Sequence, residues 1–127
     1  MEFYTVGTHT IDIFLVSTLA IVSVTFHPLT NIDSFILQLH HSQRYYLEIM
    51  SNIGSKSINK LDNVPATLIR IIILGTEDGY PPNHVSIEIV KRDFFDLLNI
   101  RRQCCLFVDI VGCLHPNTIT KNYAKSI

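Results

Sequence analysis

The feature that most constrains this chain is a run of 20 residues, 13–32, that contains no charged side chain. Asp12 and Asp33 bound the run, and its first 14 residues, Ile13 to Phe26, read IFLVSTLAIVSVTF. A helix of about 20 apolar residues is long enough to cross the hydrocarbon core of a bilayer. Serine and threonine are tolerated there, because their hydroxyls bond to the helix's own carbonyls. Residues 13–32 therefore predict a transmembrane helix, a membrane location and contact with membrane lipid.

Other interpretations of residues 13–32 stay open. The strongly apolar part is only 14 residues long, which also suits a buried core helix or the centre of a signal peptide. His27-Pro28 interrupts the run, and its many β-branched residues suit a pair of buried strands. A cleaved signal is disfavoured, because residues 1–12 carry two acidic side chains and no cation.

The composition predicts one folded domain that does not bind nucleic acid. The chain has 127 residues, of which 47% are hydrophobic and 17% charged, so it has enough apolar surface for one core. Its net charge is −1, whereas binding to phosphates needs a clustered excess of cations. The cationic pairs Lys91-Arg92 and Arg101-Arg102 are neutralised by Asp93 and Asp96 beside them.

Residues 33–63 are predicted to form an amphipathic helix followed by a polar linker. Asn31, Asp33 and Ser34 are residue types that cap a helix N-terminus, and Gly54 suits a C-terminal stop. The apolar residues that recur at helical spacing are Ile32, Phe35, Ile36, Leu39, Tyr46 and Met50. The following segment, 51–63, is rich in turn-forming residues.

Residues 64–114 are predicted to form a small ββαβ unit. Strands are expected at 68–74 and 85–89, joined as a hairpin by the Gly- and Pro-rich loop 75–83. A short helix would follow from Asp93 to about Gln103, and a strand would span 104–111 until Gly112 stops it. Residues 115–127 read as a flexible tail. The predicted fold class is therefore α+β, with one N-terminal hydrophobic helix after segment 1–12, one amphipathic helix and the ββαβ unit.

Two short patterns resemble ligand sites but lack the required geometry. Gly54-Ser55-Lys56-Ser57 has neither the second glycine nor the preceding strand of a phosphate-binding loop, and a flexible linker explains it better. Cys104, Cys105, Cys113 and His115 do not supply the two close ligand pairs of a zinc site. We interpret the cysteines as buried thiols, with Cys113 in a turn.

The remaining titratable pairs are explained by the surface of a folded domain. His40-His41 would lie on a polar helix face, where adjacent rings diverge by about 100°. His84 and Glu88 fall on a predicted strand, which removes the helical i,i+4 geometry. Glu77-Asp78 reads as a solvated loop tip. The sequence thus predicts no catalytic residue, no metal ligand, no cofactor-binding residue and no enzymatic activity.

Three hypotheses about function follow. The main one is a small single-pass membrane protein without enzymatic activity. The alternative is a soluble α/β interaction module with residues 13–26 at its centre. The third is a reading frame with no selected biochemical role, because Arg70, Asp109 and Gln43 interrupt apolar segments and would leave buried polar groups without an evident partner.

Overall fold

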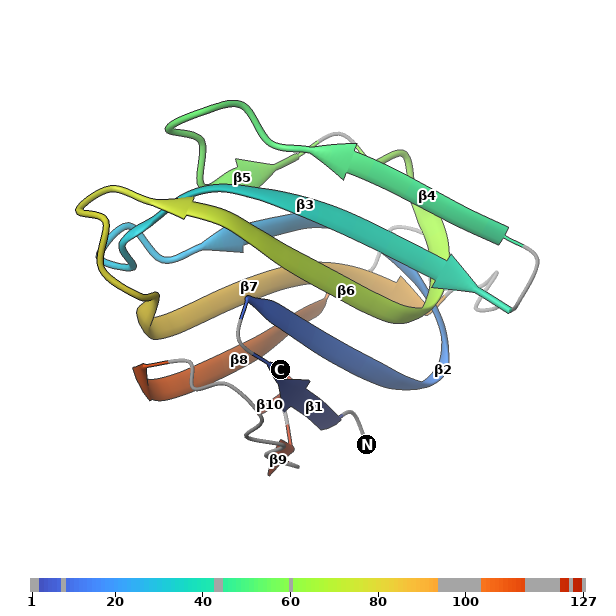
Figure 1. Cartoon of the computed structure of the whole chain (residues 1–127). Helices are drawn as coiled ribbons and strands as arrows, with labels where there is room; N and C mark the ends of the chain where they lie inside the picture. Colours follow the sequence, from blue (N-terminus) through green and yellow to red (C-terminus); the bar gives the residue numbers. More distant parts are fainter. Residues whose placement is uncertain are drawn as a thin grey trace.

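The computed structural model describes residues 3–7, 9–42, 45–59, 61–93, 104–113, 122–123 and 125–126 (Figure 1). Every regular element in these ranges is a β-strand, so the α+β prediction is wrong. No helix in the ranges could span a bilayer, and the predicted transmembrane, single-pass topology is therefore wrong as well.

Within these ranges, ten strands form one sheet, and all of their pairings are antiparallel. The strands are β1 (Phe3–Val6), β2 (Thr10–Phe26), β3 (Ile32–His41), β4 (Tyr45–Met50), β5 (Ser57–Ile58), β6 (Val64–Thr76), β7 (Asn83–Asp93), β8 (Cys104–Cys113), β9 (Asn122–Tyr123) and β10 (Lys125–Ser126). Their order is β10-β8-β7-β2-β6-β3-β4, while β1 pairs with β2 and β9, and β5 pairs with β2.

The run predicted to cross a membrane is the central strand of this sheet. Residues 13–26 belong to β2, residues 27–31 form a turn and Ile32 begins β3. β2 pairs with β6 along one side, and with β1 and then β7 along the other. Its register with β6 breaks between Phe14 and Leu19, where the strand bends. Neighbouring strands thus satisfy the backbone groups that a helix would have satisfied internally, and the β-branched side chains pack on a pleated surface.

The segment predicted as an amphipathic helix is a β-hairpin. β3 and β4 pair in unbroken register from Ile36 opposite Met50 to His41 opposite Tyr45. Within β3, Phe35, Leu37 and Leu39 are fully buried, while the alternate residues are partly exposed. This period of two defines a strand with one face toward the core.

The sheet curls so that β3, β4 and β6 lie over β7 and β8 (Figure 1). Buried side chains from both layers form one hydrophobic core. Leu37 and Ile69 from one layer and Ile87 from the other belong to the same buried cluster. Phe26 and Phe35 meet edge to face, with ring centroids 4.8 Å apart. Two short C-terminal strands add to one side of the curl, because β9 pairs with β1 and β10 pairs with β8.

The strands predicted at 68–74, 85–89 and 104–111 are confirmed as parts of β6, β7 and β8. The hairpin predicted between the first two is wrong, because β2 lies between β6 and β7 and pairs with both. Gly112 does not stop the last strand, which continues to Cys113. The helix predicted after Asp93 falls outside the described residues.

Candidate partner-binding cleft

The loop between β6 and β7 is organised by one side chain, that of Asn31, which is only 8% exposed. Its amide nitrogen donates to Asp78 Oδ1 at 3.0 Å and to the Pro81 carbonyl at 3.3 Å. Its Oδ1 accepts from the Asn83 backbone N–H at 3.1 Å. A single buried amide therefore holds the loop at three points, and buried polar groups are expected to be satisfied in this way.

Contacts at the base of the loop hold it further. The Thr76 hydroxyl donates to the Tyr80 carbonyl at 2.7 Å, and the Tyr80 N–H donates to Asp78 Oδ1 at 3.1 Å. The Lys56 ammonium pairs with Glu77 at 2.9 Å and also donates to two backbone carbonyls, those of residues 28 and 30, at 2.6 Å each. Lys56 and Glu77 therefore connect the turn 27–31 to the loop between β6 and β7. The role of Lys56 in the structure is to stabilise these two segments, and it does not form part of a phosphate-binding loop.

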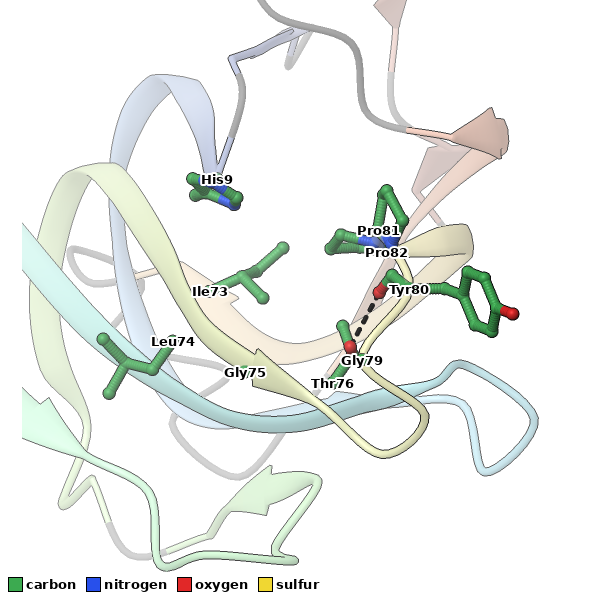
Figure 2. Close-up of a pocket in the computed structure, with 9 residues that line it drawn as sticks. All are labelled: His9, Ile73, Leu74, Gly75, Thr76, Gly79, Tyr80, Pro81 and Pro82. Atoms are coloured by element: carbon green, nitrogen blue, oxygen red, sulfur yellow. Dashed lines mark hydrogen bonds between the residues drawn. The ribbon is translucent and has the colours of Figure 1, made fainter.

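The braced loop forms one wall of a cleft of about 220 Å³. Figure 2 shows His9 across the cleft from Pro81 and Pro82, with Ile73 between them and the Tyr80 ring pointing away from the opening. The residues that line the cleft are His9, Ile73, Leu74, Gly75, Thr76, Gly79, Tyr80, Pro81 and Pro82. None of them is an Asp, Glu, Lys or Arg.

Among the described residues, the last part of β6 has no strand partner on the side of the cleft. β2 pairs with β6 only as far as Thr10 opposite Ile72, although β6 continues to Thr76. The Ile73 N–H still donates to the His9 carbonyl at 2.7 Å. Within the described residues, no strand pairs with Leu74 to Thr76 on the side of β6 that faces β2. These residues therefore lie beside the opening of the cleft. Leu74 and Tyr80 stand at the rim, 49% and 70% exposed.

The hydrogen bonds that Asp78 accepts lower the pKa of its carboxyl group. The bond from the Asn31 amide has the largest effect, and the bond from the Tyr80 N–H has the next largest. The pKa of the Asp78 carboxyl group is therefore lower in the folded than in the unfolded protein. Its ionised form stabilises the folded protein at pH values above the unfolded-state pKa, and this stabilisation is lost as the pH falls through the folded-state pKa. We therefore expect acid to loosen the loop 76–83.

A pH titration by NMR would measure this effect. The Asp78 carboxyl carbon and the Tyr80 amide should titrate together, with a midpoint below that of an ordinary aspartate. In Asp78→Asn the shared transition should disappear. A midpoint at or above the ordinary value would contradict the proposed role of the Asn31 bond.

A second hollow, of about 300 Å³, lies near the start of β7 and is lined by His27, Leu29, His84, Ser86 and Asp109. His84 has a φ of 42° at a register break in β7, and its Nε2 lies 3.6 Å from Asp109 Oδ1. A serine nucleophile needs a base within hydrogen-bonding reach. Among the described residues, the Ser86 hydroxyl makes no hydrogen bond to either imidazole. The hollow therefore lacks that catalytic arrangement.

The titratable pairs singled out in the sequence do not converge on one site. His40 and His41 are consecutive residues of a strand, and the His40 ring packs on Tyr46 with centroids 4.8 Å apart. Glu88 contacts the Cys105 sulfur at 3.7 Å. In the part of the chain that the structure describes, no group of three His, Cys, Asp or Glu side chains could hold a metal ion.

The cationic and cysteine candidates are also scattered. Lys91 is 9% exposed, and Arg92 donates to Asn63 Oδ1 at 2.9 Å. Cys105 is partly buried in β8, and Cys113 ends that strand, where a turn had been expected. Arg101-Arg102 and His115 fall outside the described residues.

Searches for related proteins add nothing to this geometry. No protein-family model, curated protein or solved structure matches this chain. The function must therefore be inferred from the cleft itself.

Sequence reasoning located the loop of the cleft but missed the residue that organises it. The motif Gly79-Tyr80-Pro81-Pro82 marked a turn, and Asn31 was considered only as a helix cap. Its bond to Asp78 spans 47 residues, so no local pattern reveals it. His9 joins the cleft only because β2 lies beside β6.

Proposed function

We propose that this chain is a protein-binding module without catalytic activity, and that the cleft between His9 and Pro82 holds one large apolar side chain of its partner. The observation that carries the proposal is a loop-built cleft that has an apolar rim and no Asp, Glu, Lys or Arg in its lining. The interaction-module hypothesis is kept in this form, with an all-β fold in place of α/β.

The size of the cleft favours a side chain over a cofactor. Pockets for drug-sized ligands usually enclose about 300–1,000 Å³, whereas this cleft has about 220 Å³. A single protruding side chain in a small desolvated pocket is typical of the residues that dominate protein–protein binding. Leu74 and the rings of Pro81 and Pro82 would surround the inserted group and exclude water.

The chemistry of the lining favours an apolar group. An anionic ligand such as a phosphate group would find no Lys or Arg in the cleft. Burying an unpaired charge is unfavourable, so a charged side chain would be excluded too. Because Asn31 already orders the loop, binding would lose little conformational entropy.

Selection of random peptides displayed on phage, with the full chain as the immobilised target, tests this proposal. We expect the selected peptides to share a Trp, Tyr, Phe or Leu. Leu74→Ala should weaken their binding by about tenfold or more, which is typical of a central interface residue. Ile53→Ala is the matched control, because Ile53 is 88% exposed and lies outside the cleft.

Three outcomes would overturn the proposal. The first is the recovery of no binding peptide. The second is a set of peptides that share charged residues and no large apolar one. The third is equal loss of binding in Leu74→Ala and Ile53→Ala.

A further inference from the structure

The two outermost long strands of the sheet, β8 and β4, are not equally covered by a further strand. β8 is followed in the sheet by β10, which covers part of its outer side. β4 is the last strand at the opposite end, and among the described residues β3 is its only strand partner. An uncovered edge strand presents unpaired backbone N–H and C=O groups that can pair with another strand.

β4 also lacks the features that usually block edge pairing. All six of its residues, Tyr45–Met50, stay in register with β3, so no bulge twists the edge away. The strand YYLEIM contains no proline and no lysine. Its only charged side chain is Glu48, which lies on the outer face of the sheet. The core-facing residues, Leu47 and Ile49, are only half-buried, so an additional strand would cover them.

The outer face of β4 has a specific polar arrangement. The Tyr46 hydroxyl donates to Glu48 Oε1 at 2.7 Å, and the Gln38 amide donates to the same oxygen at 2.8 Å. Tyr46 and Met50 are 49% and 64% exposed. The described contacts of Glu48 use Oε1 alone, which leaves Oε2 available to a group beyond the edge.

We propose that β4 pairs antiparallel with β4 of a second copy of this chain, with Leu47 opposite Leu47 at the two-fold axis. This register places Tyr46 of each copy opposite Glu48 of the other, so each hydroxyl can exchange its bond to Glu48 of its own strand for one to the Glu48 opposite. It also places Tyr45 opposite Ile49. The core-facing side chains of the two copies then adjoin, because opposite residues in antiparallel strands share a face.

The two adjacent registers that keep the faces matched are less favourable. Centring the pair on Glu48 sets two carboxylates directly opposite each other, which is destabilising. Centring it on Tyr46 pairs fewer residues of β4 and leaves Ile49 and Met50 without an opposite residue in the strand. The position of the single charge and the number of paired residues together favour the register centred on Leu47 over these two.

Sedimentation equilibrium of the full chain over a range of concentrations tests the proposal, which does not depend on the cleft. The wild-type chain should reach twice its 14.5 kDa mass. Tyr46→Glu would set carboxylates opposite each other at two places, and we expect it to raise the dissociation constant about tenfold or more. Tyr46→Lys removes the same phenol but faces Glu48 with a cation, so it should remain a dimer.

Two double variants check the register. Tyr46→Glu with Glu48→Lys restores opposite charges across the axis and should restore the dimer. Tyr46→Lys with Glu48→Lys sets lysines opposite each other and should give a monomer, even if Tyr46→Glu alone fails to fold. Thermal unfolding followed by circular dichroism verifies that each variant is folded. A wild-type chain that stays monomeric would overturn the proposal, as would equal dissociation of Tyr46→Glu and Tyr46→Lys.

Discussion

Replacing Asn31 with alanine is expected to lower the free energy of unfolding by about 2–3 kcal/mol and to disorganise the loop 76–83. The substitution removes two donated bonds and one accepted bond at a side chain that is almost fully buried. Each such bond contributes about 0.5–1.5 kcal/mol. The Asn83 N–H and the Pro81 carbonyl would lose a partner, which adds a desolvation cost. Urea unfolding measures the change.

Asn52→Ala is the matched control for this prediction. Asn52 is exposed, and no hydrogen bond of its side chain is described. Its replacement should change the free energy of unfolding by no more than about 0.5 kcal/mol. A double-mutant cycle with Asp78→Ala would isolate the bond between Asn31 and Asp78. Asn31→Ala should also weaken peptide binding at the cleft. A variant that loses stability but binds normally would show that Asn31 does not shape the cleft.

The sequence was most informative where a strand has one polar and one apolar face. Val85, Ile87 and Ile89 alternate with polar residues, and they are the buried face of β7. The run at 68–74 was also recognisable, because β-branched residues dominate it. In both places the local pattern and the final burial agree. The partners of these strands were not recognisable, since pairing of both with β2 depends on residues more than 40 positions away.

Arg70 shows why a local pattern can mislead about foldability. In the sequence it interrupts an apolar run and suggests an unpaired buried charge. In the structure it points to the outer face of β6, where its Nε and Nη2 donate to both carboxylate oxygens of Asp12 at 2.8 and 3.3 Å. The register between β2 and β6 sets the two residues opposite each other. Arg70 therefore no longer supports the hypothesis of a chain without a selected role.

The other two supposed conflicts give that hypothesis little support either. Asp109 interrupts the apolar run of β8, but its side chain is 59% exposed and lies near His84. It is therefore not a buried charge. Gln43 falls outside the described residues.

The mistaken helix at 32–50 has a physical explanation in the outer face of the sheet. Phe35, Leu37 and Leu39 point to the core with a period of two. Ile36 and Met50 are apolar as well but lie opposite each other on the outer face. Adding these outer residues to the inner ones produces spacings of three and four, which imitate a helix.

Phe35 and Ile36 offer the sharpest test of strand against helix in this segment. In the predicted helix both side chains lie on the apolar face, so truncating either would have a similar cost. In β3 they point to opposite faces. Phe35 is fully buried and meets Phe26 edge to face, while Ile36 is only partly covered. Phe35→Ala should therefore lower the free energy of unfolding by about 3–5 kcal/mol.

Ile36→Ala is the matched comparison, because it truncates the adjacent residue in the same strand. We expect it to cost about 1 kcal/mol, since its side chain already contacts solvent. Chemical denaturation of both variants, with the slope of the transition checked for change, gives the two values. Nearly equal losses would argue against the assigned faces of β3. A large difference would place Phe35 in the core and Ile36 on the surface, as the pairing of β3 with β4 and β6 requires.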